Sequence, residues 1–314
     1  MTVDVDKRRV QGSLVPEPTF TSYYGKPVLN EPVWRSPDVP GYLFLGGLAA
    51  GSALLGAGGQ LTGRRALATR SKVAALVAIG ASGVALVHDL GRPERFVYML
   101  RTFKPTSPMS VGSWLLAAFG PLTGVAAFSA VTSTWNRVGA IAAVGAAGLA
   151  PGVAAYTAAL LSDTAVPAWH DAYRELPFVF VGSAALAAGG LGLVTAPLAE
   201  ASPARSMALL GWMCEAGSLE MLRRRLGMIA EPYDEGRAGR WLRAGKVLAA
   251  AGGVGALLGS RHRMVSVLAG SAAVAGSICT RFGVFHAGVQ SARDPKYTIV
   301  PQRQRLLGNV TLPT

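Results

Sequence analysis

Long runs without a charged side chain are the feature that most limits what this chain can fold into. Of its 314 residues, 51% are hydrophobic and only 15% are charged. No Asp, Glu, Lys or Arg occurs in four stretches, 39–63, 105–136, 138–162 and 176–199. A helix rises about 1.5 Å per residue, so each stretch can cross the roughly 30 Å hydrocarbon core of a bilayer. The pattern predicts a polytopic membrane protein of the all-α class.

Shorter hydrophobic segments raise the expected number of transmembrane helices to about eight, arranged as a bundle with both termini on one side. Three segments, 72–90, 206–223 and 246–260, are short or carry charges, and the last needs snorkelling of flanking basic side chains to span the bilayer. The full set is 41–63, 72–90, 110–133, 138–162, 177–199, 206–223, 246–260 and 264–286.

Three parts follow from this division. Residues 1–39 form a polar, proline-rich tail that is expected to be irregular and to dock on a partner. Residues 40–288 form the eight-helix transmembrane domain, and residues 289–314 form a C-terminal tail. No apolar region of a secretory signal precedes the first span, which we therefore expect to direct insertion.

Basic residues are distributed unequally between the two faces of the expected bundle. Of the 30 Lys and Arg, 22 lie on the face that carries both termini and 8 lie on the other. Since basic loops tend to stay in the cytoplasm, we expect a multi-pass protein of the cell membrane with cytoplasmic termini. Orientation also explains the net charge of +13 without a nucleic-acid partner. The two cysteines lack a CxxC spacing, so any iron-sulfur cluster must belong to a partner.

The stretch HDLGRPERFVYMLRTFKPTSPMSVGSW, which begins at His88, is unusually polar for its place between two apolar segments. His88 and Asp89 end the second expected helix, and Arg92 lies within reach of both if that helix continues. Prolines then break the helix, and Ser107 or Ser110 can cap the next one. Two interpretations remain open: a polar functional pocket, or an interfacial ion-pair cluster followed by a turn.

This stretch resembles the signature of the NrfD/polysulfide-reductase family of membrane subunits. In that family a D-L-G-[RK]-P run leads through R-x-F-[KR]-x-x-S-x-M-[ST]-x-G-[ST]-W into the third helix, as the sequence does from Asp89 to Trp114. YLFLGGLAAGSALL at 42–55 is similar to the first helix of the family, and TRFGVFHAGVQSARDPKYT at 280–298 is similar to the ending of some members. The resemblance covers most of residues 20–300.

The resemblance implies a quinone-binding membrane anchor with no haem or metal of its own. Such a subunit pairs with a ferredoxin-like iron-sulfur subunit and usually with a molybdopterin catalytic subunit, and it exchanges electrons with menaquinone or ubiquinone. SYYGKPVLNEPVW in the tail is similar to versions that accompany formate-dehydrogenase-like molybdenum subunits. The chain is then a subunit of a quinone-linked oxidoreductase and not a catalyst by itself.

A quinone that takes two electrons must also take two protons, so this interpretation needs acidic groups at the pocket. His88 and Asp89 are the candidates for quinone protonation, with Arg92 orienting them. Aromatic residues are candidates for packing against the ring. The expected quinone site comprises Tyr42, His88, Asp89, Arg92, Ser110, Trp114 and Tyr156.

Glu215, Glu220 and Arg281 are the candidates for a proton path, because they are ionisable residues inside expected helices, where charges are costly and usually functional. The two glutamates lie about 140° apart around a helix and do not share a face. One of them is a candidate for a proton path and the other for pairing with the basic loop; alternatively, both pair with the arginines at 223–225 or other interfacial cations. Asp294 is the expected partner of Arg281.

Two other functions remain open for this chain. The charges within the membrane are compatible with a proton- or ion-translocating transporter, and a structural anchor without a quinone site is also compatible with the pattern. A haem between His88 and His286 is disfavoured, because the family is haem-free. His170 is expected to be a solvated residue on the face opposite the termini.

Overall fold

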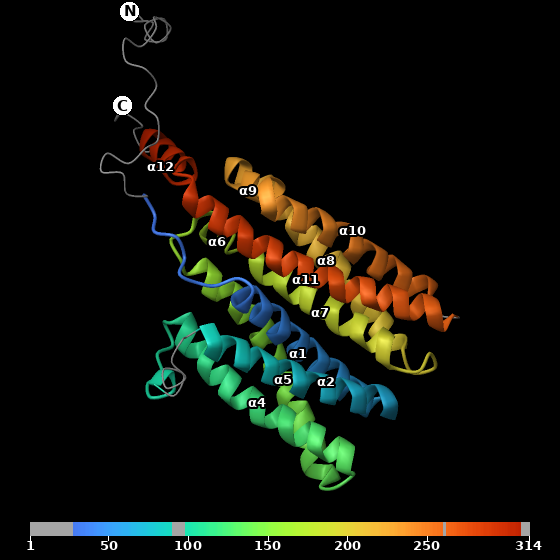
Figure 1. Cartoon of the computed structure of the whole chain (residues 1–314). Coiled ribbons are helices and arrows are strands. Elements are labelled where there is room, and N and C mark those ends of the chain that lie inside the picture. Colours follow the sequence, from blue (N-terminus) through green and yellow to red (C-terminus); the bar gives the residue numbers. More distant parts are fainter. Residues whose placement is uncertain (1–27, 90–97, 260–261, 309–314) are drawn as a thin grey trace, which may run out of the picture.

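The computed structural model of the chain describes residues 28–89, 98–259 and 262–308 (Figure 1). Within these residues the regular structure is helical, without a strand. The predicted all-α fold is therefore confirmed. A backbone in lipid can satisfy its N–H and C=O groups only inside a helix or in a closed barrel, so helices are the expected outcome.

In this part of the chain, eight helices of 20 residues or more run the length of a bundle. One of the eight, α8 (Ser202–Leu226), is less apolar than the others and carries the two glutamates. It has 25 residues and lies alongside α7 and α10. Its presence agrees with the prediction of about eight membrane helices. Seven helices are long and apolar enough to cross a membrane: α1 (Asp38–Leu61), α2 (Arg65–Asp89), α4 (Pro108–Thr132), α5 (Asn136–Ser162), α7 (Leu176–Thr195), α10 (Gly236–Leu258) and α11 (Arg263–Arg293).

Two helices begin earlier than their hydrophobic runs. α2 begins at Arg65 instead of residue 72, and α10 begins at Gly236 instead of residue 246. Arg and Lys are good helix formers, so a helix continues where an apolar run stops. The segment that was expected to be short is therefore part of a 23-residue helix, which rises about 35 Å.

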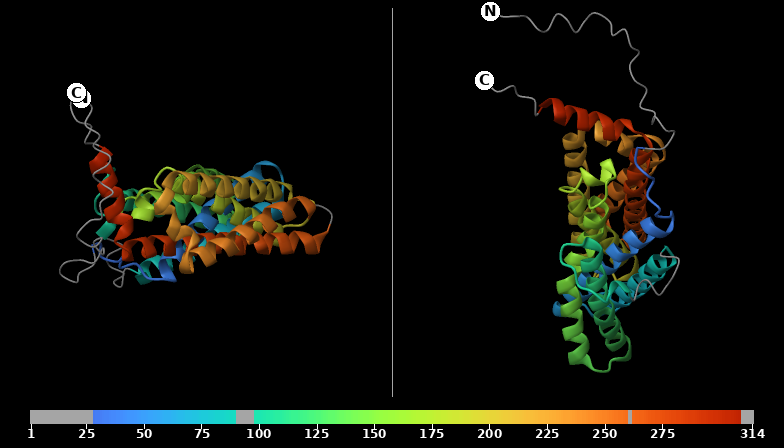
Figure 2. Two further views of the ribbon diagram at one scale, coloured as in Figure 1. Left: turned by 90° about the horizontal axis from the view of Figure 1, so that it is seen from above. Right: turned by 90° about the vertical axis from the view of Figure 1, so that its left-hand side faces the viewer.

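The long helices form two four-helix groups that meet along α1 and α7. The first group is α1, α2, α4 and α5, and the second is α7, α8, α10 and α11 (Figure 1). Successive long helices alternate in direction, so the start of α1 and the end of α11 lie at the same end of the bundle. We call this end the terminal face. The C-terminal helix α12 (Lys296–Gly308) lies across it (Figure 2).

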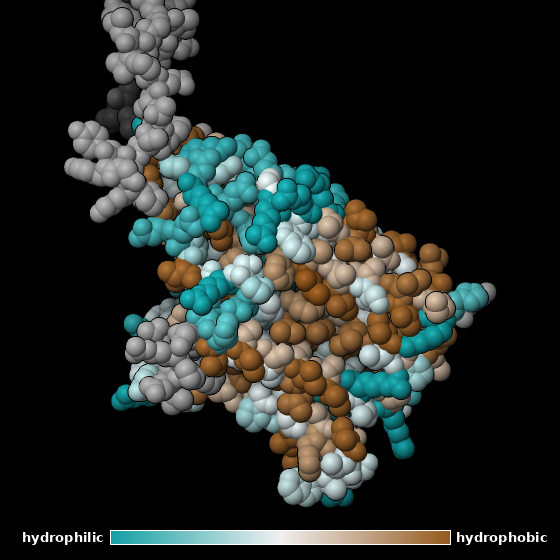
Figure 3. Space-filling model, viewed as in Figure 1, coloured by the Kyte–Doolittle hydropathy of each residue, from teal (hydrophilic) through white to brown (hydrophobic). Residues whose placement is uncertain are grey.

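The outside of the bundle is apolar along the helices. Large hydrophobic side chains are exposed there, among them Val84, Phe128, Ile141, Leu210 and Val247. Figure 3 shows this apolar surface next to a hydrophilic region at the terminal face. Such a surface would drive aggregation in water and suits a protein surrounded by lipid.

Trp169 fixes the short elements that cover the terminal face. It is fully buried, donates its indole N–H to a backbone carbonyl of α11 at 2.9 Å, and occupies the space where a Cβ on Gly288 would be. Trp34, from the irregular segment 28–37, stacks on it with ring centroids 5.5 Å apart.

The prediction that His170 lies on the opposite face is wrong, because α5 ends at the terminal face. The short elements are α6 (Pro167–His170), η2 (Gly227–Ala230) and α9 (Glu231–Asp234).

Ion pairs join the connections on the terminal face. Arg225 at the end of α8 donates Nε and Nη2 to the two carboxylate oxygens of buried Glu175, each at 2.6 Å. Lys296 of α12 binds Glu231 of α9 at 2.9 Å, and this ammonium holds the pKa of the Glu231 carboxyl below its ordinary value. Polar contacts as well as packing therefore hold this face together.

Small residues allow α1 to lie very close to α7. A Cβ added to Gly51 would lie 2.6 Å from the Cβ of Ala188 and 2.7 Å from the carbonyl oxygen of Ala184. In lipid, helices associate through such close van der Waals contact and not through the hydrophobic effect. Gly47 and Gly51 of the GLAAG pattern have the small-xxx-small spacing that places both against α7.

Replacing Gly51 with alanine is expected to destabilise the fold by about 1–3 kcal/mol, because the new methyl group forces α7 away from α1. The matched control is Gly58→Ala in the same helix, where an added Cβ meets nothing within 4 Å. Thermal unfolding of both variants in detergent measures the difference. Equal unfolding midpoints would contradict the close contact.

Candidate functional site

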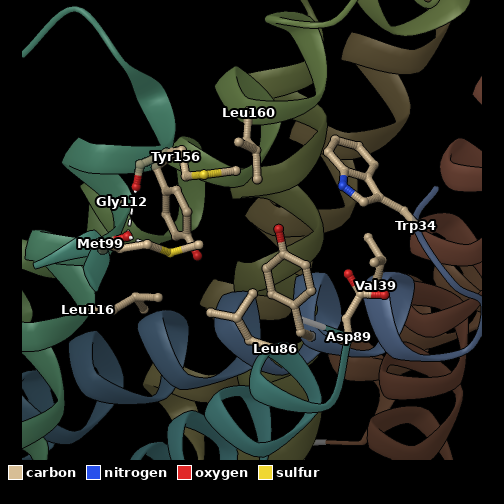
Figure 4. Close-up of a pocket in the computed structure, with 12 residues that line it drawn as sticks. Trp34, Val39, Leu86, Asp89, Met99, Gly112, Leu116, Tyr156 and Leu160 are labelled. Atoms are coloured by element: carbon tan, nitrogen blue, oxygen red, sulfur yellow. Dashed lines mark hydrogen bonds between the residues drawn. The ribbon is translucent and has the colours of Figure 1, made fainter. Parts of the chain in front are cut away.

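A pocket lies near the terminal face in the first four-helix group, between α1, α2, α4 and α5. It holds about 540 Å³ of empty space, and its walls are mostly apolar with few polar groups (Figure 4). The lining residues are Trp34, Val39, Tyr42, Leu86, Asp89, Met99, Met109, Gly112, Ser113, Leu116, Tyr156 and Leu160.

Tyr42 and Tyr156 bring hydroxyl groups to this pocket from two helices. Tyr42 lies in the second turn of α1, is 4% exposed, and lines the pocket together with Tyr156 of α5 and Asp89. Tyr156 lies over Gly112 of α4, where an added Cβ would come within 2.5 Å of the ring carbons. The glycine therefore provides the space for the tyrosine ring. The two tyrosines expected from the sequence do line the same pocket.

Asp89 is both a pocket residue and an anchor for the N-terminal segment. It is the last residue of α2, and its Oδ1 accepts a hydrogen bond from the backbone N–H of Arg35 at 3.1 Å. Trp34, the preceding residue, forms part of the pocket wall beside Asp89 (Figure 4). The segment 28–37 thus completes a pocket that the helices alone leave open.

His88 and Asp89 face different surroundings. Neighbouring residues in a helix point about 100° apart, and the His88 side chain is 69% exposed. Its Nδ1 lies 2.9 Å from Oδ2 of Asp38 at the start of α1, and His88 is not among the residues that line the pocket. Arg92, expected to orient both residues, lies outside the described residues.

Ser110 and Trp114 hold the loop before α4 and do not line the pocket. Ser110 Oγ accepts a hydrogen bond from the backbone N–H of Lys104 at 3.0 Å and donates one to the Thr102 carbonyl at 3.1 Å. Trp114 is 41% exposed and meets Phe103 edge to face, with ring centroids 6.2 Å apart. Both residues therefore shape the loop at the rim of the first group.

Sequence reasoning missed three kinds of pocket residue. Trp34 comes from an irregular tail, and only its contacts in space show that it reaches the pocket. Met99 and Met109 supply flexible apolar side chains that no local pattern distinguishes. Gly112 had a signal, because it lies in the MSVGSW part of the motif and glycine is costly inside a helix.

A second polar cluster lies buried in the other four-helix group. Glu215 of α8 is 2% exposed and Arg281 of α11 is 1% exposed. Thr280 donates its hydroxyl to Glu215 Oε1 at 2.5 Å, while Arg281 donates Nη2 to the Phe180 carbonyl at 2.6 Å and lies over the Phe180 ring. Among the described atoms, Glu215 Oε2 and Arg281 Nε and Nη1 have no hydrogen-bond partner. The structure thus brings together two of the three residues expected for a proton path.

Glu220 lies apart from this cluster at the membrane surface. Its carboxylate binds Arg224, one turn further along α8, at 2.8 Å and is half exposed. A groove of about 420 Å³ between α8 and α10 runs past Glu220 and Lys246 to Glu215. The expected partner of Arg281 is wrong: Asp294 accepts a hydrogen bond from the backbone N–H of Lys296 instead.

Metal-ligand geometry does not occur in the part of the chain that is described: no three His, Cys, Asp or Glu side chains come together to hold an ion. The two histidines considered for a haem have separate surroundings. His88 binds Asp38, and His286 lines a groove beside Arg237 and Arg293.

All the residues that line the pocket fall in the part of the chain that matches a known family. Residues 27–213 match the family described as polysulphide reductase, NrfD. A comparison with curated proteins gave no match. The family match covers more than half of the 314 residues and includes the helices and the motif that build the pocket. The chain is a multi-pass membrane protein that belongs to the NrfD polysulphide reductase family.

Proposed function

We propose that the pocket in the first four-helix group binds a quinone, either menaquinone or ubiquinone, and that the chain exchanges electrons between the quinone pool and its redox partners. Membership of the NrfD family implies association with redox partner subunits and with the membrane. One observation carries the proposal: an apolar pocket near the terminal face that contains two tyrosine hydroxyls and a carboxylate.

The lining of the pocket fits a quinone. Pockets for small molecules usually have apolar walls and a few polar groups that orient the ligand. The walls of this pocket have that character. Leu86, Leu116 and Leu160 can pack against a ring and its isoprenoid chain, and the two methionines can adapt to their shape.

A bound quinone would supply two-electron chemistry, and its reduction takes up two protons. Asp89 is the pocket group suited to exchange these protons. The hydroxyls of Tyr42 and Tyr156 would donate hydrogen bonds to quinone carbonyl oxygens and hold them in place. His88 would act by positioning, since its contact with Asp38 holds the start of α1 against the end of α2.

The terminal face is the proposed docking side for the partners. We expect a ferredoxin-like iron-sulfur subunit there, followed by a molybdopterin subunit of the formate-dehydrogenase-like kind. The pocket lies near this face, and the first turns of α10 add the basic residues Arg237, Arg240 and Arg243 to it. The same basic bias supports cytoplasmic termini. No haem or metal held by this chain is part of the proposal.

Asp89→Asn is expected to slow quinone turnover about 100-fold or more, because the amide can still accept the Arg35 hydrogen bond but cannot exchange a proton. His88→Ala removes only the contact with Asp38 and is expected to have a much smaller effect. Turnover is measured on the purified complex, with a reduced viologen dye as electron donor and menadione as acceptor. Full turnover of the Asp89→Asn complex would contradict the assignment of the site.

Metal analysis and mass spectrometry of the same preparations control for assembly. We expect molybdenum, iron and an iron-sulfur subunit to accompany the chain in both variants. A chain isolated without these metals would favour a transporter. A complete complex that does not bind menadione would favour a structural anchor.

Gly112→Ala is expected to weaken quinone binding about tenfold, because the new methyl group collides with the Tyr156 ring and pushes it into the pocket. Gly120→Ala is the matched control, since it lies two turns further along α4 with nothing within 4 Å of an added Cβ. Quenching of tryptophan fluorescence by menadione measures the affinity. Equal affinities would place the quinone elsewhere.

A second candidate function is proton translocation through the second four-helix group. The observation that favours it is the buried cluster of Glu215 and Arg281, with polar atoms that have no described partner. The groove between α8 and α10 leads to this cluster past Glu220 at its mouth. Ionisable groups at such depth are costly and usually mark proton or ion paths.

Glu215→Gln is expected to lower the number of protons moved across the membrane for each quinone reduced, since an amide cannot carry a proton. The control is Glu235→Gln, an exposed glutamate at the start of α10. A pH-sensitive dye inside proteoliposomes that contain the complex reports proton movement. An unchanged ratio in the Glu215→Gln complex would remove this candidate.

A further inference from the structure

A polar groove lies on the terminal face between the N-terminal segment and the helices α10 and α11. It holds about 970 Å³ of space, part of it open to solvent. Glu31 and Ser36 line it from the segment, Arg237 lines it from α10, and His286 and Arg293 line it from α11. The groove is separate from the proposed quinone pocket, and its lining is more polar.

The rim of the groove carries an excess of positive charge. Glu31 is the acidic residue in the described lining, and its carboxylate already binds Arg293 at 3.0 Å. Arg237 is exposed and forms no ion pair with the residues that the structure describes. Arg240, one turn further along α10, is exposed as well. A guanidinium in this position can bind the carboxylate of another molecule through two parallel hydrogen bonds.

The floor of the groove is apolar. Trp34 lines it from the segment, and Phe285 and Val289 line it from α11. Val33, next to Trp34 in the chain, is 91% exposed. Protein-protein interfaces typically combine an apolar centre with a polar rim that is rich in arginine. The groove therefore has the chemistry of a contact with another protein.

The position of the groove favours a partner on the water side of the membrane. On α11 its lining runs from Phe285 to Arg293, the last turns of that helix. Figure 3 shows hydrophilic side chains over the terminal face and the apolar surface along the helices. Lipid chains suit the second surface and not the first. A soluble subunit is thus the occupant that fits the surroundings of the groove.

We propose that the groove holds an acidic segment of the iron-sulfur partner, with a carboxylate bound by Arg237 and an apolar side chain packed against Trp34 and Val289. The inference rests on the proposed function, and it assigns the docking contact to one part of the terminal face. Trp34 lines both the groove and the quinone pocket, so one indole ring separates the docked partner from the pocket. Such closeness suits electron transfer, whose rate falls steeply with distance.

The test uses the purified complex, immobilised through a tag on this chain and washed with increasing salt. The iron retained per chain measures the bound partner. Arg237→Glu is expected to weaken the binding of the iron-sulfur subunit about tenfold or more, because the new carboxylate repels that of the partner. Arg237→Gln is expected to give an intermediate loss, since it removes the charge without reversing it.

Two further variants separate the groove from general attraction by a basic surface. Arg65→Glu makes the same charge change at the opposite end of the bundle, in the exposed first residue of α2, and is expected to retain all the iron. Arg240→Glu makes it on α10 outside the groove lining. A smaller loss than that of Arg237→Glu is expected there, because only long-range attraction is weakened.

Three results would overturn the groove as the docking site. One is equal iron retention by Arg237→Glu and the unaltered complex. Another is an equal loss from Arg237→Glu and Arg240→Glu, which would mean that the basic face attracts the partner without the groove. The third is release of phospholipid in place of iron, which would assign Arg237 to lipid headgroups. Failure of the proposed function is distinguishable from all three, because the unaltered complex would then contain no iron or would not reduce menadione.

Discussion

Close contact between the glycine and alanine faces of α1 and α7 joins the two halves of this protein. Lipid provides no hydrophobic force between helices, so the halves associate only where their backbones can come near each other. Gly51 lies against Ala184 and Ala188, and Gly47 one turn earlier leaves room for the Arg281 guanidinium. Tyr42, near the start of the same helix, lines the pocket of the first group. One helix therefore borders both polar regions, and its packing fixes their separation.

The two polar regions differ in how their charges are balanced. At the terminal face, charges form direct ion pairs such as Arg225 with Glu175. Inside the second group, Glu215 and Arg281 bind neutral hydroxyl and carbonyl groups. Each also keeps polar atoms that have no hydrogen-bond partner among the described atoms. Burial of such groups opposes stability. The second candidate function gives these groups a role in moving protons.

Much of the fold could be predicted from the sequence, because charge-free runs report directly on lipid. All eight expected segments correspond to helices, including the charged segment that became α8. The starts of α2 and α10 could not be predicted from hydrophobicity, since basic residues continue a helix beyond the apolar run. In the site, Tyr42, Asp89 and Tyr156 were expected and do line one pocket. His88 was paired with Asp89 by adjacency, but helical geometry turns it toward Asp38. Trp34 and the Glu215 neighbours depend on contacts between distant segments, which no local pattern encodes.

The origin of Trp34 has a consequence for the order in which the protein is made. The segment that carries it leaves the ribosome before α1, yet its contacts, Asp89 and Trp169, are synthesised later. The pocket wall can therefore close only after α6 has emerged and folded onto the end of the bundle. Until then, the pocket lacks this wall. Trp169 is itself held by the Val284 carbonyl of α11, so completion of the pocket wall follows synthesis of the last long helix.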